Sequence, residues 1–170
     1  MIAGAGTVAD EILDDMPDVD AICFGIGGGG MAAGTAVTAR ARRPGIRLIG
    51  VEPDGATGMR QSLDAGRPVY LDPPPRTAVV DALGAPFAGT LNYEIVRDLG
   101  VEVYVLLDAQ IIEAMWLLIE RAKILAEPAA AAGFAALLHG AASPALAPGA
   151  KVVCIVTGGN VDRERLKRLA

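Results

Sequence analysis

The sequence predicts an α/β fold: an open, mostly parallel sheet with helices on both faces. Short, almost wholly apolar runs recur along the chain, and helical stretches separate them. Runs of this kind are typical of strands that are buried on both faces. Strands that alternate with helices form a parallel sheet through right-handed crossover connections. At 170 residues, the chain is long enough for one domain with a sizeable core.

The apolar runs mark the expected strands and frame the expected helices. The strands span residues 21–25, 46–51, 101–107 and 151–157. A first helix is expected from Gly30 to Arg43, where small and apolar residues follow a run of glycines. Its C-terminal end carries Arg40, Arg42 and Arg43, and positive charge there complements the helix dipole.

Further helices are expected in the second half of the chain. Asp108 is a suitable N-cap for a helix whose apolar residues recur at helical spacing. These residues are Ile111, Ile112, Met115, Leu118 and Ile119. Pro128 starts the next helix, which continues through alanines to Leu138. A short helix is expected after Asp162, and surface connections are expected at residues 72–75, which are rich in proline, and 143–148.

Composition and charge narrow the class of protein. Hydrophobic residues make up 52% of the chain and charged residues 21%, which indicates a soluble globular protein rather than a disordered one. The net charge of −5 disfavours a nucleic-acid partner, because phosphate backbones bind clustered Lys and Arg. No apolar stretch reaches the length of a membrane span, and the N-terminus lacks the pattern of a secretory signal.

The cysteines and the histidine are expected to have structural roles. Cys23 and Cys154 each lie in an apolar run without CxxC spacing, which fits buried side chains in a reduced, cytoplasmic protein. His139 is the only histidine and follows a helical stretch. Neither a multi-histidine metal site nor a Ser-His-Asp triad is therefore well supported.

The first glycine loop, Gly25 to Met31, follows the first strand and opens the first helix. Consecutive glycines let the backbone fold tightly and direct several N–H groups at one anion. The N-terminus of the helix adds its partial positive charge. The loop therefore predicts a phosphate-binding site rather than a plain turn.

The identity of the phosphate ligand stays open at this point. Gly25, Gly27 and Gly30 satisfy the pattern G-x-G-x-x-G, and Glu52 ends the next strand. In dinucleotide-binding domains, an acidic residue at that position binds the ribose hydroxyls. An oxidoreductase domain of the Rossmann type is therefore one hypothesis.

The second glycine loop, Thr157 to Asn160, follows the last strand. Ligands of open parallel sheets collect at the carboxyl ends of the strands. Both glycine loops are thus expected at one edge of the sheet, where Thr157 would present a hydroxyl group.

Taken together, these segments resemble the pyridoxal-phosphate (PLP) enzymes of fold type II, within them the serine/threonine dehydratases (threonine ammonia-lyases) and serine racemases. The resemblance lies in a set of short motifs that occur in the family's order over essentially the whole chain. They are Ile2 to Thr7, Gly27 to Gly34, Gly50 to Pro53, Glu120 to Lys123, Glu127 to Ala129 and Thr157 to Asn160. The chain resembles the C-terminal part of the large domain of such an enzyme.

The resemblance implies the roles of particular residues. The cofactor phosphate would be bound by the backbone of the first glycine loop, at Gly27, Gly28, Gly29, Gly30 and Met31. Thr157 would place its hydroxyl at the pyridine nitrogen, and a neutral partner there does not favour the protonated ring. Glu127 is expected near the site or, equally, as an acid at a helix N-terminus.

Two positions depart from the family pattern. Ala82 replaces a glycine beside the cofactor, and alanine disfavours a positive φ. Metal-using relatives have a Glu, a backbone carbonyl and an Asp, which Glu52 and Ala56 match, but Gly58 stands at the Asp position. We therefore expect no metal ion.

The family's catalytic lysine, which holds the cofactor as a Schiff base, has no counterpart in this sequence. The lysines present are Lys123, expected in a helix, Lys151 and Lys167, and none has the family's Ser-x-Lys pattern. We expect residues 1–170 to form a single incomplete α/β domain that lacks the N-terminal lysine-bearing segment and the small domain.

The resemblance implies a lyase that converts a small hydroxy amino acid to a 2-oxo acid and ammonia, with this chain inactive alone. The sequence does not distinguish serine from threonine as the substrate, or deamination from racemisation as the reaction. The alternatives are the dinucleotide-binding oxidoreductase domain and a non-catalytic phosphate-ligand or assembly module. The chain is expected to associate with further copies of itself or with a missing N-terminal half.

Overall fold

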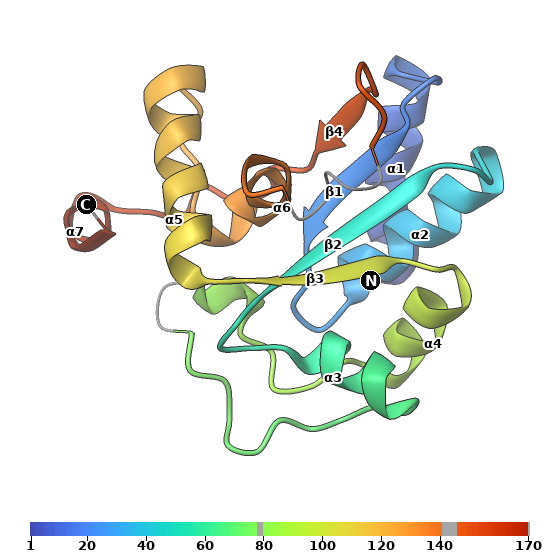
Figure 1. Cartoon of the computed structure of the whole chain (residues 1–170), viewed down its shortest axis with the longest axis horizontal. Coiled ribbons are helices and arrows are strands. Elements are labelled where there is room, and N and C mark those ends of the chain that lie inside the picture. Colours follow the sequence, from blue (N-terminus) through green and yellow to red (C-terminus); the bar gives the residue numbers. More distant parts are fainter. Residues whose placement is uncertain (78–79, 141–145, 170) are drawn as a thin grey trace.

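The computed structural model describes residues 1–77, 80–140 and 146–169, and it contains the predicted open parallel sheet. Within these residues, four strands are all parallel and lie in the order β3-β2-β1-β4 (Figure 1). They are β1 (Ala21–Gly25), β2 (Arg47–Pro53), β3 (Glu102–Leu106) and β4 (Val152–Cys154). The predicted α/β class is confirmed.

Helices cover both faces of the sheet, also as predicted (Figure 1). One face packs against α1 (Ile2–Asp15), α2 (Gly30–Arg42) and α4 (Thr90–Asp98). The other face packs against α5 (Asp108–Leu117) and α6 (Pro128–Leu138). Successive strand residues point to opposite faces, so Ile22 and Phe24 belong to the first layer and Cys23 to the second.

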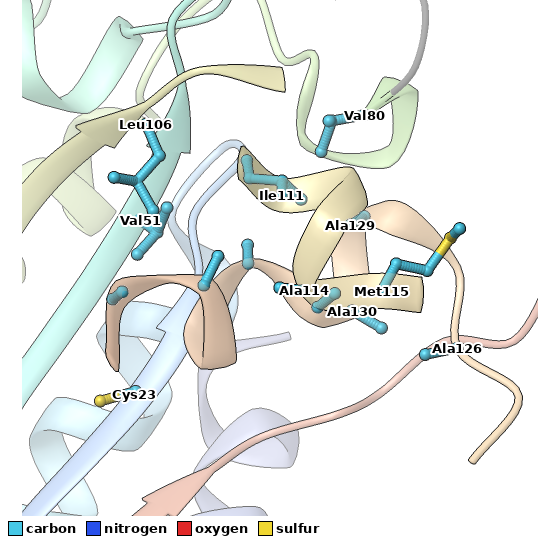
Figure 2. Close-up of a cluster of buried hydrophobic side chains, with 14 of the residues drawn as sticks. Cys23, Val51, Val80, Leu106, Ile111, Ala114, Met115, Ala126, Ala129 and Ala130 are labelled. Carbon is cyan, nitrogen blue, oxygen red and sulfur yellow. The ribbon is translucent and has the colours of Figure 1, made fainter. Parts of the chain in front are cut away.

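The layer beneath α5 and α6 is built from small side chains on one helix and larger ones on the other. Figure 2 shows Cys23, Val51 and Leu106 of the sheet facing this cluster. The helix α5 contributes Ile111 and Met115, both fully buried, whereas α6 contributes alanines. Alanine side chains let α6 lie close to the strands, which fixes the start of α6 near the edge of the sheet where both glycine loops begin.

Most element boundaries agree with the sequence within two residues, but several details differ. The fourth strand is shorter than predicted, ending at Cys154, and its residues are half-buried because β4 is an edge strand. Cys154 is therefore half-buried, whereas Cys23 is buried as expected. Residues 143–145 of the predicted surface loop lie outside the described residues, and 146–148 are irregular.

The start and end of α5 also differ from the prediction. Asp108 is the first residue of α5 rather than its cap, and its carboxylate accepts a hydrogen bond from Thr77 Oγ1 at 3.2 Å. A π-helical turn, Leu118–Ala122, continues α5. It ends at Lys123, which has a φ of 59° and so lies outside the helix in which it was expected.

The elements not predicted are α1, α3 (Gly58–Ala65), α4 and a short 3₁₀ helix, Asp81–Leu83. The expected short helix after Asp162 is α7 (Arg163–Leu169). Arg165 of α7 forms an ion pair with Asp81 at 2.7 Å, and Trp116 Nε1 donates a hydrogen bond to Leu169 O at 2.8 Å. The described part of the chain contains no helix that is both long and apolar enough to cross a membrane.

Candidate phosphate-binding site

The two glycine loops begin at the same edge of the sheet, as the sequence predicts. Cys23 of β1 is paired in register with Cys154 of β4, and Ile155 N–H donates a hydrogen bond to Cys23 O at 2.9 Å. Because the strands are parallel, their carboxyl ends lie side by side. Thr157 follows β4 at this edge, where it is exposed to solvent.

A cavity of about 500 Å³ surrounds the first glycine loop. All residues of the loop line it, and so does Ala82 of the 3₁₀ helix Asp81–Leu83. Gly89 and Asn92, at the start of α4, complete one wall. The predicted residues Gly27, Gly28, Gly29, Gly30, Met31 and Ala82 are thus brought together. Thr157 is not part of this lining.

The loop presents unpaired backbone donors to the cavity. Among the described residues, the N–H groups of Gly27 to Met31 have no hydrogen-bond acceptor. The last of them belong to the first turn of α2, where backbone N–H groups carry partial positive charge. Unpaired donors at a helix N-terminus form a binding site for an anion.

Glycine is required at the N-cap of α2. Gly29 has a φ of 88°, a left-handed backbone conformation that residues with a side chain rarely adopt. A Cβ atom on Gly29 would lie 2.6 Å from Met59 Cε and 3.0 Å from Asn92 Cβ. The tight turn therefore depends on the absence of a side chain.

Ala82 adopts an ordinary backbone conformation. Among the described non-glycine residues, only Lys123 has a positive φ. Alanine was expected to disfavour a positive φ at position 82, and the 3₁₀ helix indeed needs no left-handed residue there. Ala82 N–H donates to Asp81 Oδ1 at 2.9 Å, and the residue forms part of the cavity wall.

Glu127 connects α6 to the second glycine loop. It is the N-cap residue of α6, but its side chain does not cap the helix. Its carboxylate instead accepts a hydrogen bond from Asn160 N–H at 3.1 Å, and its own N–H donates to Gly158 O at 3.0 Å. Glu127 therefore holds the segment that follows Thr157.

Glu52 serves α3 and not a ligand. Its carboxylate is 1% exposed and accepts hydrogen bonds from the N–H groups of Met59 at 2.7 Å and Arg60 at 2.8 Å. Burial raises the pKa of Glu52 to about 7, although these two hydrogen bonds lower it in part. Because the carboxylate is buried against α3, ribose hydroxyls do not reach it, which counts against the dinucleotide hypothesis. Gly58 begins α3 itself.

Comparison with known proteins decides the family. A family model described as pyridoxal-phosphate dependent enzyme matches residues 1–158. The chain belongs to this family. The cofactor of this family is pyridoxal phosphate, and the glycine-lined cavity lies within the matched residues.

The similar family members include racemases and ammonia-lyases. Serine racemase of Oryza sativa subsp. indica is 40% identical over 163 residues, which are 95% of this chain and 47% of that protein. L-threonine ammonia-lyase of Thermotoga maritima is 33% identical over 169 residues, 99% of this chain and 41% of that protein. The structure of maize serine racemase has a TM-score of 0.88 at 39% identity, covering 98% of this chain and 52% of that one. The chain thus spans about half the length of these relatives.

The lysines of this family member lie away from the glycine-lined cavity. Lys123 Nζ donates to Glu120 O at 2.7 Å, Lys151 forms an ion pair with Asp18, and Lys167 pairs with Glu164 at 2.8 Å. Lys151 precedes β4, at the edge of the sheet opposite the glycine loops. None of the three lines the cavity.

Sequence reasoning missed Asn92 and Gly89. Asn92 Nδ2 donates a hydrogen bond to Gly28 O at 2.7 Å, and Gly89 N–H donates to the same oxygen at 3.1 Å. Asn92 is 64 residues from Gly28 in the chain and lies in a helix that was not predicted. A helix predicted at residues 90–98 would have been the signal in the sequence that pointed to these two residues.

Proposed function

We propose that this chain forms the phosphate-binding half of a pyridoxal-phosphate dependent ammonia-lyase for a small hydroxy amino acid. The observation that carries the proposal is the set of unpaired N–H groups, from Gly27 to Met31, that line the cavity at the N-terminus of α2. A monophosphate fits such donors because the four glycines, residues 27–30, have no side chains to exclude it. The relatives named serine racemase and L-threonine ammonia-lyase support this substrate class.

Each residue of the proposed site has a distinct task. The first glycine loop binds the phosphate, and Ala82 forms part of the wall beside it. Thr157 provides a hydroxyl group for the pyridine nitrogen, while Glu127 holds the backbone that follows Thr157. When bound, the cofactor supplies an electron sink for chemistry at the α-carbon of the amino acid. A neutral hydroxyl partner does not increase the strength of that sink by favouring ring protonation.

The proton-abstracting lysine comes from a segment outside these 170 residues in our proposal. A base must lie within hydrogen-bond reach of the proton that it removes, and the lysines of this chain do not line the cavity. We therefore propose that the chain by itself binds the phosphate ligand but does not turn over substrate. The chain is then an incomplete domain, and a separate lysine-bearing half completes the site.

A calorimetric titration tests the binding proposal. We expect pyridoxamine 5′-phosphate to bind, whereas pyridoxamine, which lacks the phosphate, and NAD do not. Pyridoxamine 5′-phosphate avoids the reaction of an aldehyde with surface lysines. Equal heats for the phosphorylated and unphosphorylated forms, or binding of NAD alone, would contradict the proposal.

Product release tests the proposed division of labour. The purified chain is incubated with pyridoxal phosphate and either L-serine or L-threonine, and 2-oxo acid is measured. We expect none from the chain alone, and activity after mixing with a separately produced N-terminal half of a family member that bears the lysine. Turnover by the chain alone would show that it is not an inactive half.

A further inference from the structure

The peptide between Gly28 and Gly29 is held in one orientation by α4. Its carbonyl oxygen, on Gly28, accepts hydrogen bonds from Asn92 Nδ2 at 2.7 Å and from Gly89 N–H at 3.1 Å. A carbonyl oxygen has two lone pairs, so these two donors satisfy it. Both donors belong to the N-terminal end of α4, on one wall of the cavity.

Fixing the carbonyl also fixes the N–H group of Gly29. The peptide unit is planar and trans, so its C=O and N–H bonds point in opposite directions. While Gly28 O faces α4, Gly29 N–H faces the other way and has no acceptor among the described residues. A flip of this peptide would replace a donor by a carbonyl oxygen, which repels an anion.

The loop cannot resist such a flip through its own side chains. Glycine populates positive and negative φ about equally, so residues 27–30 carry no steric preference of their own. Among the described residues, Asn92 provides the only side-chain hydrogen bond to the first glycine loop. Its Cβ also lies 3.0 Å from the position that a Cβ on Gly29 would occupy.

We infer that Asn92 is a positioning residue for phosphate binding: it locks the peptide between Gly28 and Gly29 so that the Gly29 N–H group donates to the anion. The inference rests on the proposed function, because it assigns the site to a phosphate group. Asn92 acts through the backbone of the loop and does not itself contact the phosphate. The role proposed for Asn92 is independent of where the catalytic lysine comes from.

The test compares Asn92→Ala and Asn92→Asp with the wild-type chain. Asn92→Ala removes the donor. Asn92→Asp keeps the size of the side chain but cannot donate when ionised, and an acidic residue in the first turn of a helix favours folding. Glu94→Ala, at an exposed position on the same helix, is the matched control.

Two readouts separate positioning from general stability. In the ligand-free protein, NMR reports the carbonyl ¹³C shift of Gly28 and the amide ¹⁵N shift of Gly29. Calorimetry reports the affinity for pyridoxamine 5′-phosphate and for inorganic phosphate. We expect both shifts to change in the Asn92 variants, and the affinity to fall about 5- to 10-fold in Asn92→Ala, the loss expected for one hydrogen bond. The fall should be larger in Asn92→Asp, with Glu94→Ala unchanged.

The outcomes are distinct for the inference and for the proposed function. Unchanged Gly28 and Gly29 shifts, or equal affinities in wild type and both Asn92 variants, would overturn the role of Asn92 and leave the proposed function standing. A wild-type chain that binds neither phosphate ligand would overturn the proposed function, and the inference with it.

Discussion

Gly29 is the residue on which the shape of the first glycine loop depends most directly. Its φ of 88° and the two close contacts of a Cβ atom leave no room for a side chain. We predict that Gly29→Ala lowers the free energy of unfolding by about 1–3 kcal/mol, the usual cost of a strained backbone conformation. It should also abolish binding of pyridoxamine 5′-phosphate.

Denaturant unfolding and calorimetry of the same variant check this prediction. Gly45→Ala is the matched control, because a Cβ there meets nothing within 4 Å and the residue has no positive φ. An unfolding free energy and an affinity that match those of the control would show that the turn tolerates a side chain.

Glu52 makes the stability of the protein depend on pH. Its pKa is raised from 4.5 to about 7 in the folded protein because the carboxylate is buried. The folded state therefore binds a proton more tightly than the unfolded state does. Stability from this group is fully present below about pH 4.5, falls as the pH rises towards 7, and is constant above that.

The variant Glu52→Gln should remove this dependence. One pKa unit corresponds to about 1.4 kcal/mol, so the difference in unfolding free energy between wild type and variant should fall by at most about 3 kcal/mol from pH 4.5 to pH 8. Urea unfolding at several pH values measures it, with Glu94→Gln at an exposed site as control. A difference that stays constant with pH would mean that Glu52 has an ordinary pKa.

At the scale of elements, α6 and the second glycine loop are joined by Glu127. The carboxylate accepts the N–H of Asn160, and the backbone of Glu127 donates to Gly158. We predict that Glu127→Ala increases hydrogen exchange at the Asn160 amide and lowers the unfolding free energy by about 1 kcal/mol, the worth of one hydrogen bond. Glu127→Gln retains an acceptor and should keep most of the protection.

Exchange rates measured by NMR or mass spectrometry test the link between these elements. Glu164→Ala, which breaks an exposed ion pair within α7, should leave Asn160 unaffected. Equal protection of Asn160 in Glu127→Ala and wild type would show that the loop holds its shape without the carboxylate.

The missed helices show where sequence patterns fail at this scale. The helix α1 contains glycines, which lower helix propensity. It forms because it packs closely on α2: a Cβ on Gly34 of α2 would lie 2.3 Å from Ile2 O of α1. The helices α3 and α4 have only 8 and 9 residues, too few for a clear periodic pattern. Tertiary packing stabilises all three.

At the scale of the molecule, the described surface exposes apolar side chains and two sheet edges. Leu107, Leu125 and Tyr70 are 55%, 57% and 67% exposed, and β3 and β4 are the edge strands. Exposed apolar groups and unpaired strand edges favour association. We predict that the isolated chain self-associates as its concentration rises, which sedimentation velocity detects. A sharply monomeric protein that melts cooperatively would contradict this prediction.

The sequence by itself determined the features that are local in the chain. Apolar runs located β1 and β2, helical spacing located the buried face of α5, and the run of glycines after β1 located the tight turn that lines the cavity. These predictions succeeded because each depends on residues within one element and the turn beside it. The meeting of both glycine loops at one edge of the sheet followed from the parallel direction of the strands.

Only the tertiary structure decided which distant groups serve these local features. Asn92 reaches Gly28 across 64 residues, and Glu127 reaches Asn160 across 33. Glu52, which fits a ribose-binding pattern in the sequence, is used by the N-terminus of α3. The partner of a polar group depends on how the helices pack against the sheet, and no local pattern of residues specifies that packing.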